Sequence, residues 1–108
     1  MSDASHYGVI TSTFPNRADA VHVADALLAE KLAACVQLLE IESRYAWKGE
    51  TRSDPEVMLL AKTRAELFAR VIDRIKALHP YETPEIVAQR FSTGYAPYLD
   101  WIAAETKV

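Results

Sequence analysis

The segment HPYETPEI, residues 79–86, gathers an imidazole, a phenol and two carboxylates between a helix-like run and a strand-like run. Its two prolines fix φ at two points, which lowers the entropy lost when side chains converge on a ligand. Imidazole binds copper and transfers protons, so a ligand site is one interpretation. The other is structural: Tyr81 packs on a neighbouring subunit while Glu82 and Glu85 pair with arginine or lysine.

Lys62 is a second candidate for chemistry because it alternates in phase with Met58 and Leu60 and therefore ends an apolar strand face. An ammonium group without a partner is costly to bury. We expect Lys62 to pair with Glu82 or Glu85, or to bind an anionic ligand.

Copper prefers imidazole and thiolate donors that converge within bonding distance, and this chain offers three histidines and one cysteine. His22 falls on the polar side of a predicted helix, and His6 lies in a terminal segment expected to be flexible (about residues 1–6), so both are predicted to be solvated. Cys35 starts a strand among alanines and is predicted to be a small buried apolar side chain. His79 remains as the metal candidate, and a multi-histidine site would need copies of it from several subunits.

Length and composition favour one globular domain without a cofactor. The chain has 108 residues, of which half are apolar, and this is enough to bury a core without metal or disulfide. With 12 basic and 15 acidic residues and no basic cluster, nucleic-acid and membrane partners are not expected. One cysteine and an N-terminal region without signal-peptide features predict the cytoplasm. No H-E-x-x-H, P-loop or G-x-S-x-G motif occurs, so we expect no enzyme.

Hydrophobic periodicity predicts the elements that position these residues, in the order β-α-β-β-α-β with a further C-terminal helix. The predicted strands are residues 7–14, 35–47, 56–62 and 86–91, and the last helix is residues 98–105. Asn16 is predicted to cap the first helix, and a turn is predicted over residues 48–55. A capping box formed by Thr63 and Glu66 is predicted to start the second helix, which ends before Pro80.

Two β-α-β halves with right-handed crossovers predict a ferredoxin-like α+β sandwich, with four antiparallel strands in one layer and two helices on one side. The second strand then lies at a sheet edge, and it is the longest strand, with Tyr45 and Trp47 near its far end. A long apolar edge favours pairing with other copies in a closed ring. The alternative is a monomer whose edge is protected by Glu40, Glu42 and Arg44.

Five segments together resemble the CutA divalent-ion tolerance family. They are LAACV (32–36), S-x-Y-x-W-x-G (43–49), E-V-x-L-L-x-K-T (56–63), HPYETPEI (79–86) and Y-L-x-W-I (98–102). The resemblance covers residues from about 24 to 104. It implies a cytoplasmic homotrimer of ferredoxin-like subunits with an extended hairpin of the second and third strands, similar in assembly to PII signal proteins. It also implies a role in tolerance of copper and other divalent cations, with no catalytic reaction.

The resemblance further implies a cleft between subunits, lined by Tyr45, Trp47, Lys62, His79, Tyr81, Glu82 and Glu85. Two features depart from the family. The segment between Cys35 and Tyr45 is one residue shorter and lacks a Pro-Gly pair, so the bend there is predicted to differ. Some members are credited with copper ligands in a cysteine near the end of the first strand and in paired histidines. The matching positions here are Ser12 and Leu78-His79, so His79 alone carries over.

Two functions follow from this resemblance. The first is a non-catalytic homotrimer for divalent-metal tolerance, with weak binding of Cu(II) or another divalent cation through His79. The second is a PII-like sensor whose cleft between subunits binds a small anionic ligand near Lys62, with metal effects being indirect.

Overall fold

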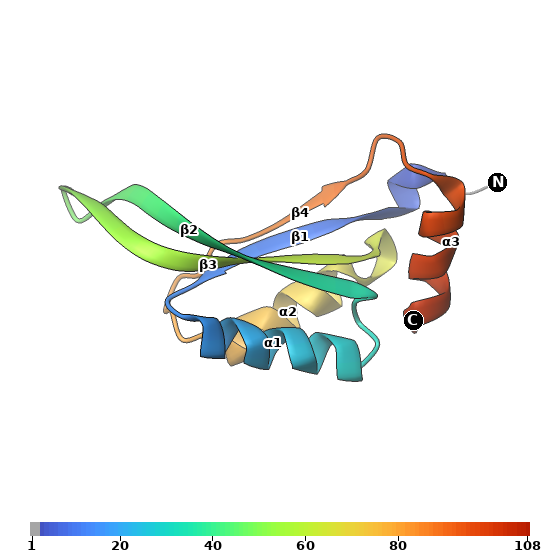
Figure 1. Ribbon diagram of the computed structural model, residues 1–108, viewed down its shortest axis with the longest axis horizontal. Coiled ribbons are helices and arrows are strands. Elements are labelled where there is room, and N and C mark those ends of the chain that lie inside the picture. The colour runs from blue at the N-terminus through green and yellow to red at the C-terminus, as the bar shows by residue number, and fades with distance from the viewer. Residues whose placement is uncertain (1–2) are drawn as a thin grey trace.

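The computed structural model describes residues 3–108 and contains one four-stranded antiparallel sheet with helices on one face. The elements are β1 (Tyr7–Phe14), α1 (Arg17–Ala29), β2 (Cys35–Trp47), β3 (Glu50–Arg64), α2 (Phe68–Leu78), β4 (Ile86–Arg90) and α3 (Ala96–Glu105), with short 3-10 helices η1 (Ala4–His6) and η2 (Ala65–Leu67). The strand order is β2-β3-β1-β4, which confirms the ferredoxin-like prediction and places β2 at an edge. Figure 1 shows α1 and α2 under the sheet and α3 standing across one end.

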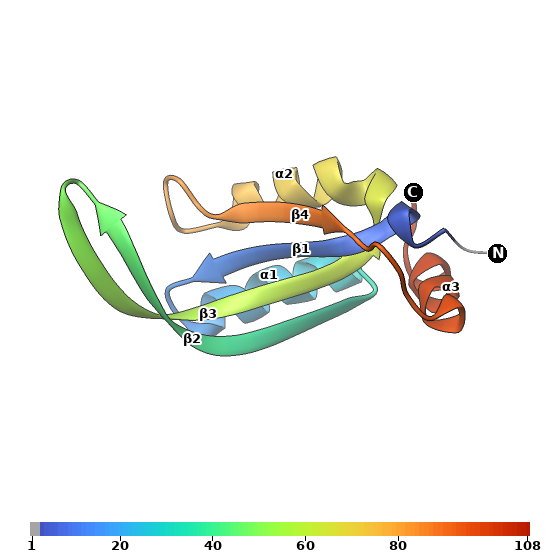
Figure 2. The same cartoon turned by 90° about the horizontal axis from the view of Figure 1, so that it is seen from above.

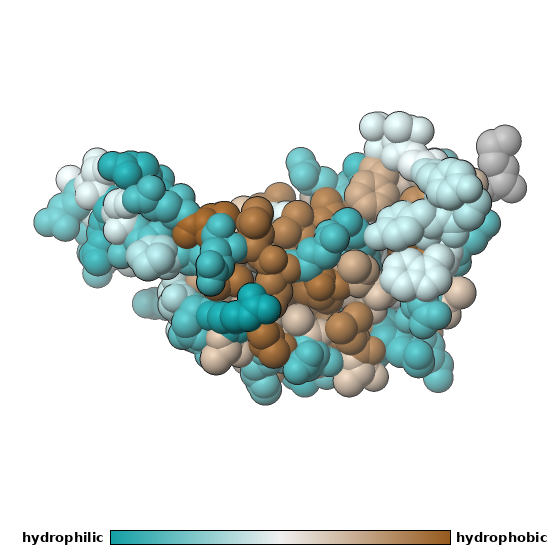
Figure 3. Space-filling model, in the orientation of Figure 1, coloured by the Kyte–Doolittle hydropathy of each residue, from teal (hydrophilic) through white to brown (hydrophobic). Residues whose placement is uncertain are grey.

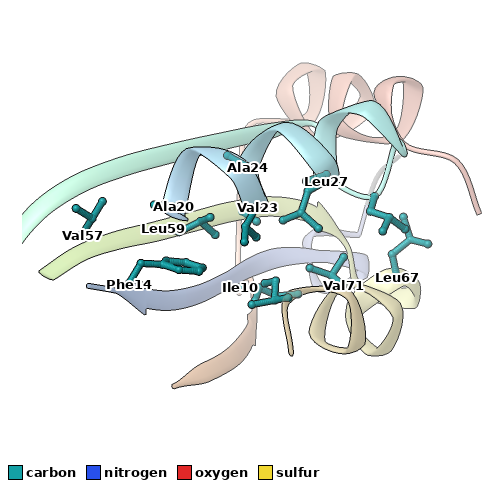
Figure 4. Packing of buried hydrophobic residues seen from close by; sticks show 14 residues of the cluster. Ile10, Phe14, Ala20, Val23, Ala24, Leu27, Val57, Leu59, Leu67 and Val71 are labelled. Carbon is teal, nitrogen blue, oxygen red and sulfur yellow. The ribbon is translucent and has the colours of Figure 1, made fainter. Parts of the chain in front are cut away.

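The core lies between the sheet and the helices α1 and α2. Alternation along the strands points one set of side chains toward these helices, and Figure 4 shows strand and helix side chains meeting there. The fully buried members include Ile10, Phe14, Leu59, Val23, Leu27 and Val71. This packing positions the ends of the strands, where the polar side chains of interest lie.

No helix of residues 3–108 packs on the other face of the sheet, and Figure 2 looks onto this face with α1 and α2 on the far side of the sheet. We call it the open face. By the pairing register, it carries Leu39 of β2, Leu60 and Lys62 of β3, and Val87 of β4. Leu39 is 56% exposed and Val87 is 50% exposed. The open face is therefore largely apolar, as the alternation of β3 predicted.

The hairpin of β2 and β3 is longer than predicted. β3 begins at Glu50, so the predicted turn over residues 48–55 is wrong, and only Lys48 and Gly49 connect the strands. These two residues have φ angles of 50° and 81°, the left-handed pair that a two-residue hairpin turn requires. The distal part of the hairpin projects past β1 as an arm, visible in Figures 1 and 2.

Pro55 explains how the arm tolerates a proline within a strand. β1 ends with the pair Phe14↔Val57, so Pro55 lies beyond β1 and its missing N–H leaves no β1 carbonyl without a donor. On its other side, β3 pairs with β2 residue for residue from Cys35 to Trp47. The segment between Cys35 and Tyr45 therefore contains no interruption of the register.

The start of the second helix also differs from the prediction. Thr63 does not cap a helix: it is a buried residue of β3, and its hydroxyl donates to the Leu32 carbonyl at 2.6 Å. The predicted capping box with Glu66 is therefore wrong. The chain passes through η2 before α2 begins at Phe68 without a side-chain cap. Pairing of Arg64 with Tyr7 keeps this stretch extended, and that tertiary pairing overrides the local capping signal.

Other predicted boundaries agree closely with the structure. The Asn16 side chain accepts a hydrogen bond from the Asp19 backbone N–H at 2.9 Å, so the predicted cap of α1 is confirmed. α2 ends at Leu78, as predicted. β4 ends one residue earlier than predicted, and α3 begins two residues earlier, with Pro97 in its first turn. Ala4–His6, within the terminus predicted to be flexible, forms η1; residues 1–2 lie outside the described part of the chain.

α1 ends in a Schellman motif built around Lys31. The Leu32 N–H donates to the Leu27 carbonyl at 2.9 Å, and the Lys31 N–H donates to the Leu28 carbonyl at 3.1 Å. This geometry places Lys31 at φ 57°, a left-handed conformation that normally favours glycine.

We predict that Lys31→Gly raises the free energy of unfolding by about 0.5–1 kcal/mol, because glycine adopts this conformation without a Cβ clash. Lys31→Ala is the matched control, since it removes the charged side chain but keeps the strain. Chemical denaturation of the three proteins measures the effect. An equal rise in the free energy of unfolding of Lys31→Ala would show that the lysine side chain, and not the left-handed backbone, is destabilising.

Candidate functional site

His79 is held on the end of β1 by both of its ring nitrogens. It directly follows α2, and its ring stacks on Phe14 with 4.3 Å between centroids and 17° between planes. Nε2 lies 2.8 Å from the Thr13 carbonyl oxygen, and the Tyr81 backbone N–H donates to Nδ1 at 3.1 Å. Because Nδ1 accepts, the proton of the neutral ring is assigned to Nε2, which donates to Thr13. Neither nitrogen is free to bind a metal in this arrangement.

Two tyrosines reach neighbouring carboxylates on β3. The Tyr81 hydroxyl donates to Glu56 Oε2 at 2.8 Å, and the Tyr45 hydroxyl donates to Asp54 Oδ2. Asp54 and Glu56 lie two residues apart on the same face of the strand, so about 6–7 Å separates them along β3. The rings of Tyr81 and His79 lie 5.0 Å apart. Tyr45, Asp54, Glu56 and Tyr81 thus form one group, which we call the tyrosine–carboxylate cluster.

The electrostatics of this cluster favour a structural role. Burial, followed by the hydrogen bond to Glu56, raises the pKa of Tyr81 well above its usual value. The hydrogen bond to Asp54 raises the pKa of Tyr45. Burial lowers the pKa of His79, although the hydrogen bond with Thr13 opposes this. Both phenols therefore remain hydrogen-bond donors at neutral pH, and both carboxylates already accept a hydrogen bond from them.

The other residues predicted to line a cleft do not join this cluster within one subunit. Lys62 lies six residues along β3 from Glu56, a separation of about 20 Å. Its predicted pairing with Glu82 or Glu85 is not made among residues 3–108, and both glutamates are exposed. Trp47 lies at the end of β2 beside the turn of the arm and is 47% exposed.

The metal-ligating side chains are also dispersed. His6 and His22 are exposed, as predicted, and Cys35 is only half-buried at the start of β2. Ser12 is fully buried, and its hydroxyl has no hydrogen-bond partner in the described part of the chain. No three His, Cys, Asp or Glu side chains within residues 3–108 converge on a point that could hold a metal ion. The donors of one subunit therefore do not form a copper site around His79.

A hollow of about 520 Å³ lies under the base of the arm. It is lined by Pro15, Asn16, Arg17, Glu40, Ile41, Glu42, Pro55, Glu56 and Val57. The Glu42 carboxylate accepts hydrogen bonds from Arg44 at 3.3 Å and from Ser53 at 2.8 Å. This hollow was not predicted, because it forms only where the arm passes the start of α1.

Two residues of the tyrosine–carboxylate cluster were missed by the sequence analysis. Glu56 was assigned to a strand, and its phase with Met58 and Leu60 was a usable signal that it shares the open face. Asp54 fell within the predicted turn, so no face was assigned to it. Register with β2 was needed to place Asp54 beside Tyr45.

The position of His79 predicts a pH-dependent stability. Its pKa is lowered in the folded protein, so folding favours the neutral ring; this contribution is complete above the unfolded pKa of about 6.5 and is lost as pH falls below it. Protonation of Nδ1 would also oppose the N–H of Tyr81. We predict that the free energy of unfolding falls between about pH 7.5 and pH 5.5, with a smaller fall in His79→Gln, which keeps one donor and one acceptor.

The matched control is His22→Gln, on the exposed side of α1. Denaturant titrations at each pH measure all three proteins at the same concentration. The same pH dependence in His79→Gln and in the wild type would contradict the assignment.

Nearly the whole chain is similar in sequence to known proteins. The model of the family described as CutA1 divalent ion tolerance protein matches residues 8–105. The divalent-cation tolerance protein CutA of Thermus thermophilus is 43% identical over 99 residues, covering 91% of this chain and 96% of that protein. Protein CutA of Homo sapiens is 38% identical over 96 residues, and the match spans 88% of this chain but only 54% of the human protein.

Among solved structures, the periplasmic divalent cation tolerance protein CutA from Archaeoglobus fulgidus superimposes with a TM-score of 0.91 at 39% identity. The superposition covers 94% of this chain and 99% of that one. Both the family model and these relatives match nearly the whole of this chain. This chain therefore belongs to the CutA1 divalent ion tolerance family.

Proposed function

We propose that this protein acts in divalent-cation tolerance as a non-catalytic homotrimer in the cytoplasm. Family membership supports the role in tolerance. The observation that carries the assembly is the open face of the sheet, which exposes large apolar side chains such as Leu39 and Val87. Figure 3 shows apolar side chains gathered between the arm and α3. A continuous apolar surface of this kind marks a protein interface.

The sheet edges support the same assembly. β2 and β4 form the two edges of the sheet, and each has a neighbour on one side only. Three copies arranged in a ring would cover the open faces and pair the edges without leaving a free one. The alternative is a monomer whose β2 edge is protected by Glu40, Glu42 and Arg44. In such a monomer Leu39, on the same strand, would remain exposed to water.

The arm also needs a partner. An isolated two-stranded hairpin is marginally stable in water, and the arm exposes Tyr45 by 39% and Trp47 by 47%. In this proposal the arm rests on a neighbouring copy. The contact brings Tyr45 and Trp47 of one subunit toward Lys62 of another, which is how the cleft inferred from the family would form.

Copper binding in this proposal is weak and requires no preformed site. His79 could offer Nδ1 to a cation only after losing the Tyr81 N–H, and each subunit contributes one such ring. A soft, multidentate site would therefore need ligands from several copies.

None of the helices in residues 3–108 is long and apolar enough to cross a bilayer.

The assembly is tested by charge substitution on the open face. We predict that the wild type has three times the mass of one chain in light scattering at micromolar concentration. Leu39→Glu should dissociate it, because the new carboxylate would lose its hydration in the interface. Leu28→Glu is the matched control, since Leu28 is 42% exposed on α1, away from the open face. A wild-type particle with the mass of one chain would overturn the homotrimer.

Calorimetric titration tests the role of His79 in copper binding. We predict that the dissociation constants of Cu²⁺ for the wild type and for His79→Gln differ by less than about threefold, which is a difference in binding free energy of under about 1 kcal/mol. The reason is that both ring nitrogens of His79 are already hydrogen-bonded. Light scattering of both samples checks that assembly is unchanged. A loss of tenfold or more in His79→Gln would instead make His79 a direct copper ligand.

A further inference from the structure

Three hydrogen-bond donors gather where β2 begins. Lys62 lies opposite Cys35 in the pairing of β2 with β3, and side chains so paired have Cβ atoms about 4.5–5.5 Å apart. Tyr98 approaches from α3: burial, and then the charge of the neighbouring Cys35, raise the pKa of the Tyr98 phenol. Figures 1 and 2 both show α3 beside the start of β2 and the end of β3. We call Cys35, Lys62 and Tyr98 the Lys62 corner.

The two stronger donors of the Lys62 corner, Lys62 and Tyr98, have no acceptor in the described part of the chain. Within residues 3–108, no carboxylate lies within 4 Å of the Lys62 ammonium, and neither Lys62 nor the Tyr98 hydroxyl makes a side-chain hydrogen bond. Yet Lys62 and Cys35 are half-buried. By contrast, Tyr81 donates to Glu56, and the Arg64 guanidinium donates to the Ala103 and Thr106 carbonyls at the end of α3.

An aromatic surface adjoins these donors. The Trp101 ring stacks on Tyr98 with 5.7 Å between centroids and 26° between planes, and it is 41% exposed. Val9 and Leu60 flank Lys62 on the open face. The corner therefore combines one cation, two weaker donors and a flat aromatic surface against which a planar group can stack.

We infer that the Lys62 corner binds a small anion, a carboxylate or a phosphate, carried on a planar apolar group. Three donors without an acceptor select a ligand that supplies only acceptors, and an ionised acceptor forms the strongest bond with an ammonium. Partial burial strengthens this attraction relative to water. The planar group would lie against Tyr98 and Trp101. This inference deepens the sensor alternative predicted from the sequence, and it does not depend on copper binding.

Tryptophan fluorescence tests the inference, because Trp101 forms part of the aromatic surface. The wild type, whose two tryptophans are Trp47 and Trp101, serves as the parent protein. Inorganic phosphate, benzoate and phenyl phosphate are the probes. We expect saturable quenching, with phenyl phosphate tighter than inorganic phosphate because it adds the planar group. The ranking of benzoate against phenyl phosphate identifies the preferred anion.

Substitutions in the parent protein locate the binding site. Lys62→Met keeps the length of the side chain without its charge and should weaken binding at least tenfold. Tyr98→Phe should weaken it several-fold while leaving the ring stack intact. Lys76→Met, an exposed lysine in the last turn of α2, is the matched control and should bind like the parent.

Light scattering of every variant separates loss of binding from loss of assembly. Absence of saturable quenching by all three probes in the parent would overturn the inference, as would equal affinities in Lys62→Met and Lys76→Met. If none of the probes binds the parent and the assembly of Lys62→Met dissociates, then Lys62 pairs with a carboxylate of a neighbouring copy. The inference is wrong in that case too. If Lys62→Met does not fold, Tyr98→Phe decides: unchanged affinity there overturns the corner.

Discussion

A sheet that is covered by helices on one face only is the constraint from which the rest of this subunit follows. β3 contributes the fully buried Leu59 to the helix side, while its next residue, Leu60, points to the open face. Within residues 3–108, no helix packs on the open face. Its middle is mixed, because Gln37 and Thr11 flank Leu60 there, and the groups with the most evident chemistry lie toward its two ends.

β3 connects these two ends, because it runs from the arm to α3. With 15 residues against 13 in β2, it is the longest strand, so the prediction that the second strand is the longest was wrong. At one end, Asp54 and Glu56 anchor the hydroxyls of Tyr45 and Tyr81. At the other, the Arg64 guanidinium donates to the Ala103 and Thr106 carbonyls, which lie at the C-terminus of α3 and have no partners within the helix. Arg64 thereby fixes α3 beside the sheet and sets the position of its aromatic side chains.

Local patterns were sufficient to predict most elements, and tertiary pairing explains the errors. The Gly, Ser, Asp and Pro residues over 48–55 are typical of a turn, yet pairing with β2 keeps all but two of the residues 48–55 extended. Thr63 had the spacing of a cap, but its hydroxyl is used inside the core. The candidate site shows the same limit: His79 and Tyr81 were identified from their types and spacing. Their partners Thr13 and Glu56 depend on register, which one sequence does not give.

The side chains of this surface differ in whether they already have hydrogen-bond partners within the chain. His79 and Tyr81 both have partners within the chain, so the imidazole and the phenol of HPYETPEI fix this segment against β1 and β3, while Glu82 and Glu85 remain exposed. A group that is already bonded must lose that bond before it can bind a ligand, and the loss reduces affinity. Lys62 and Tyr98 face no such loss. The ring side chains of the segment with the most evident chemistry in the sequence are thus fixed to the sheet, whereas Lys62 and Tyr98, at the opposite end of β3, have no acceptor within residues 3–108.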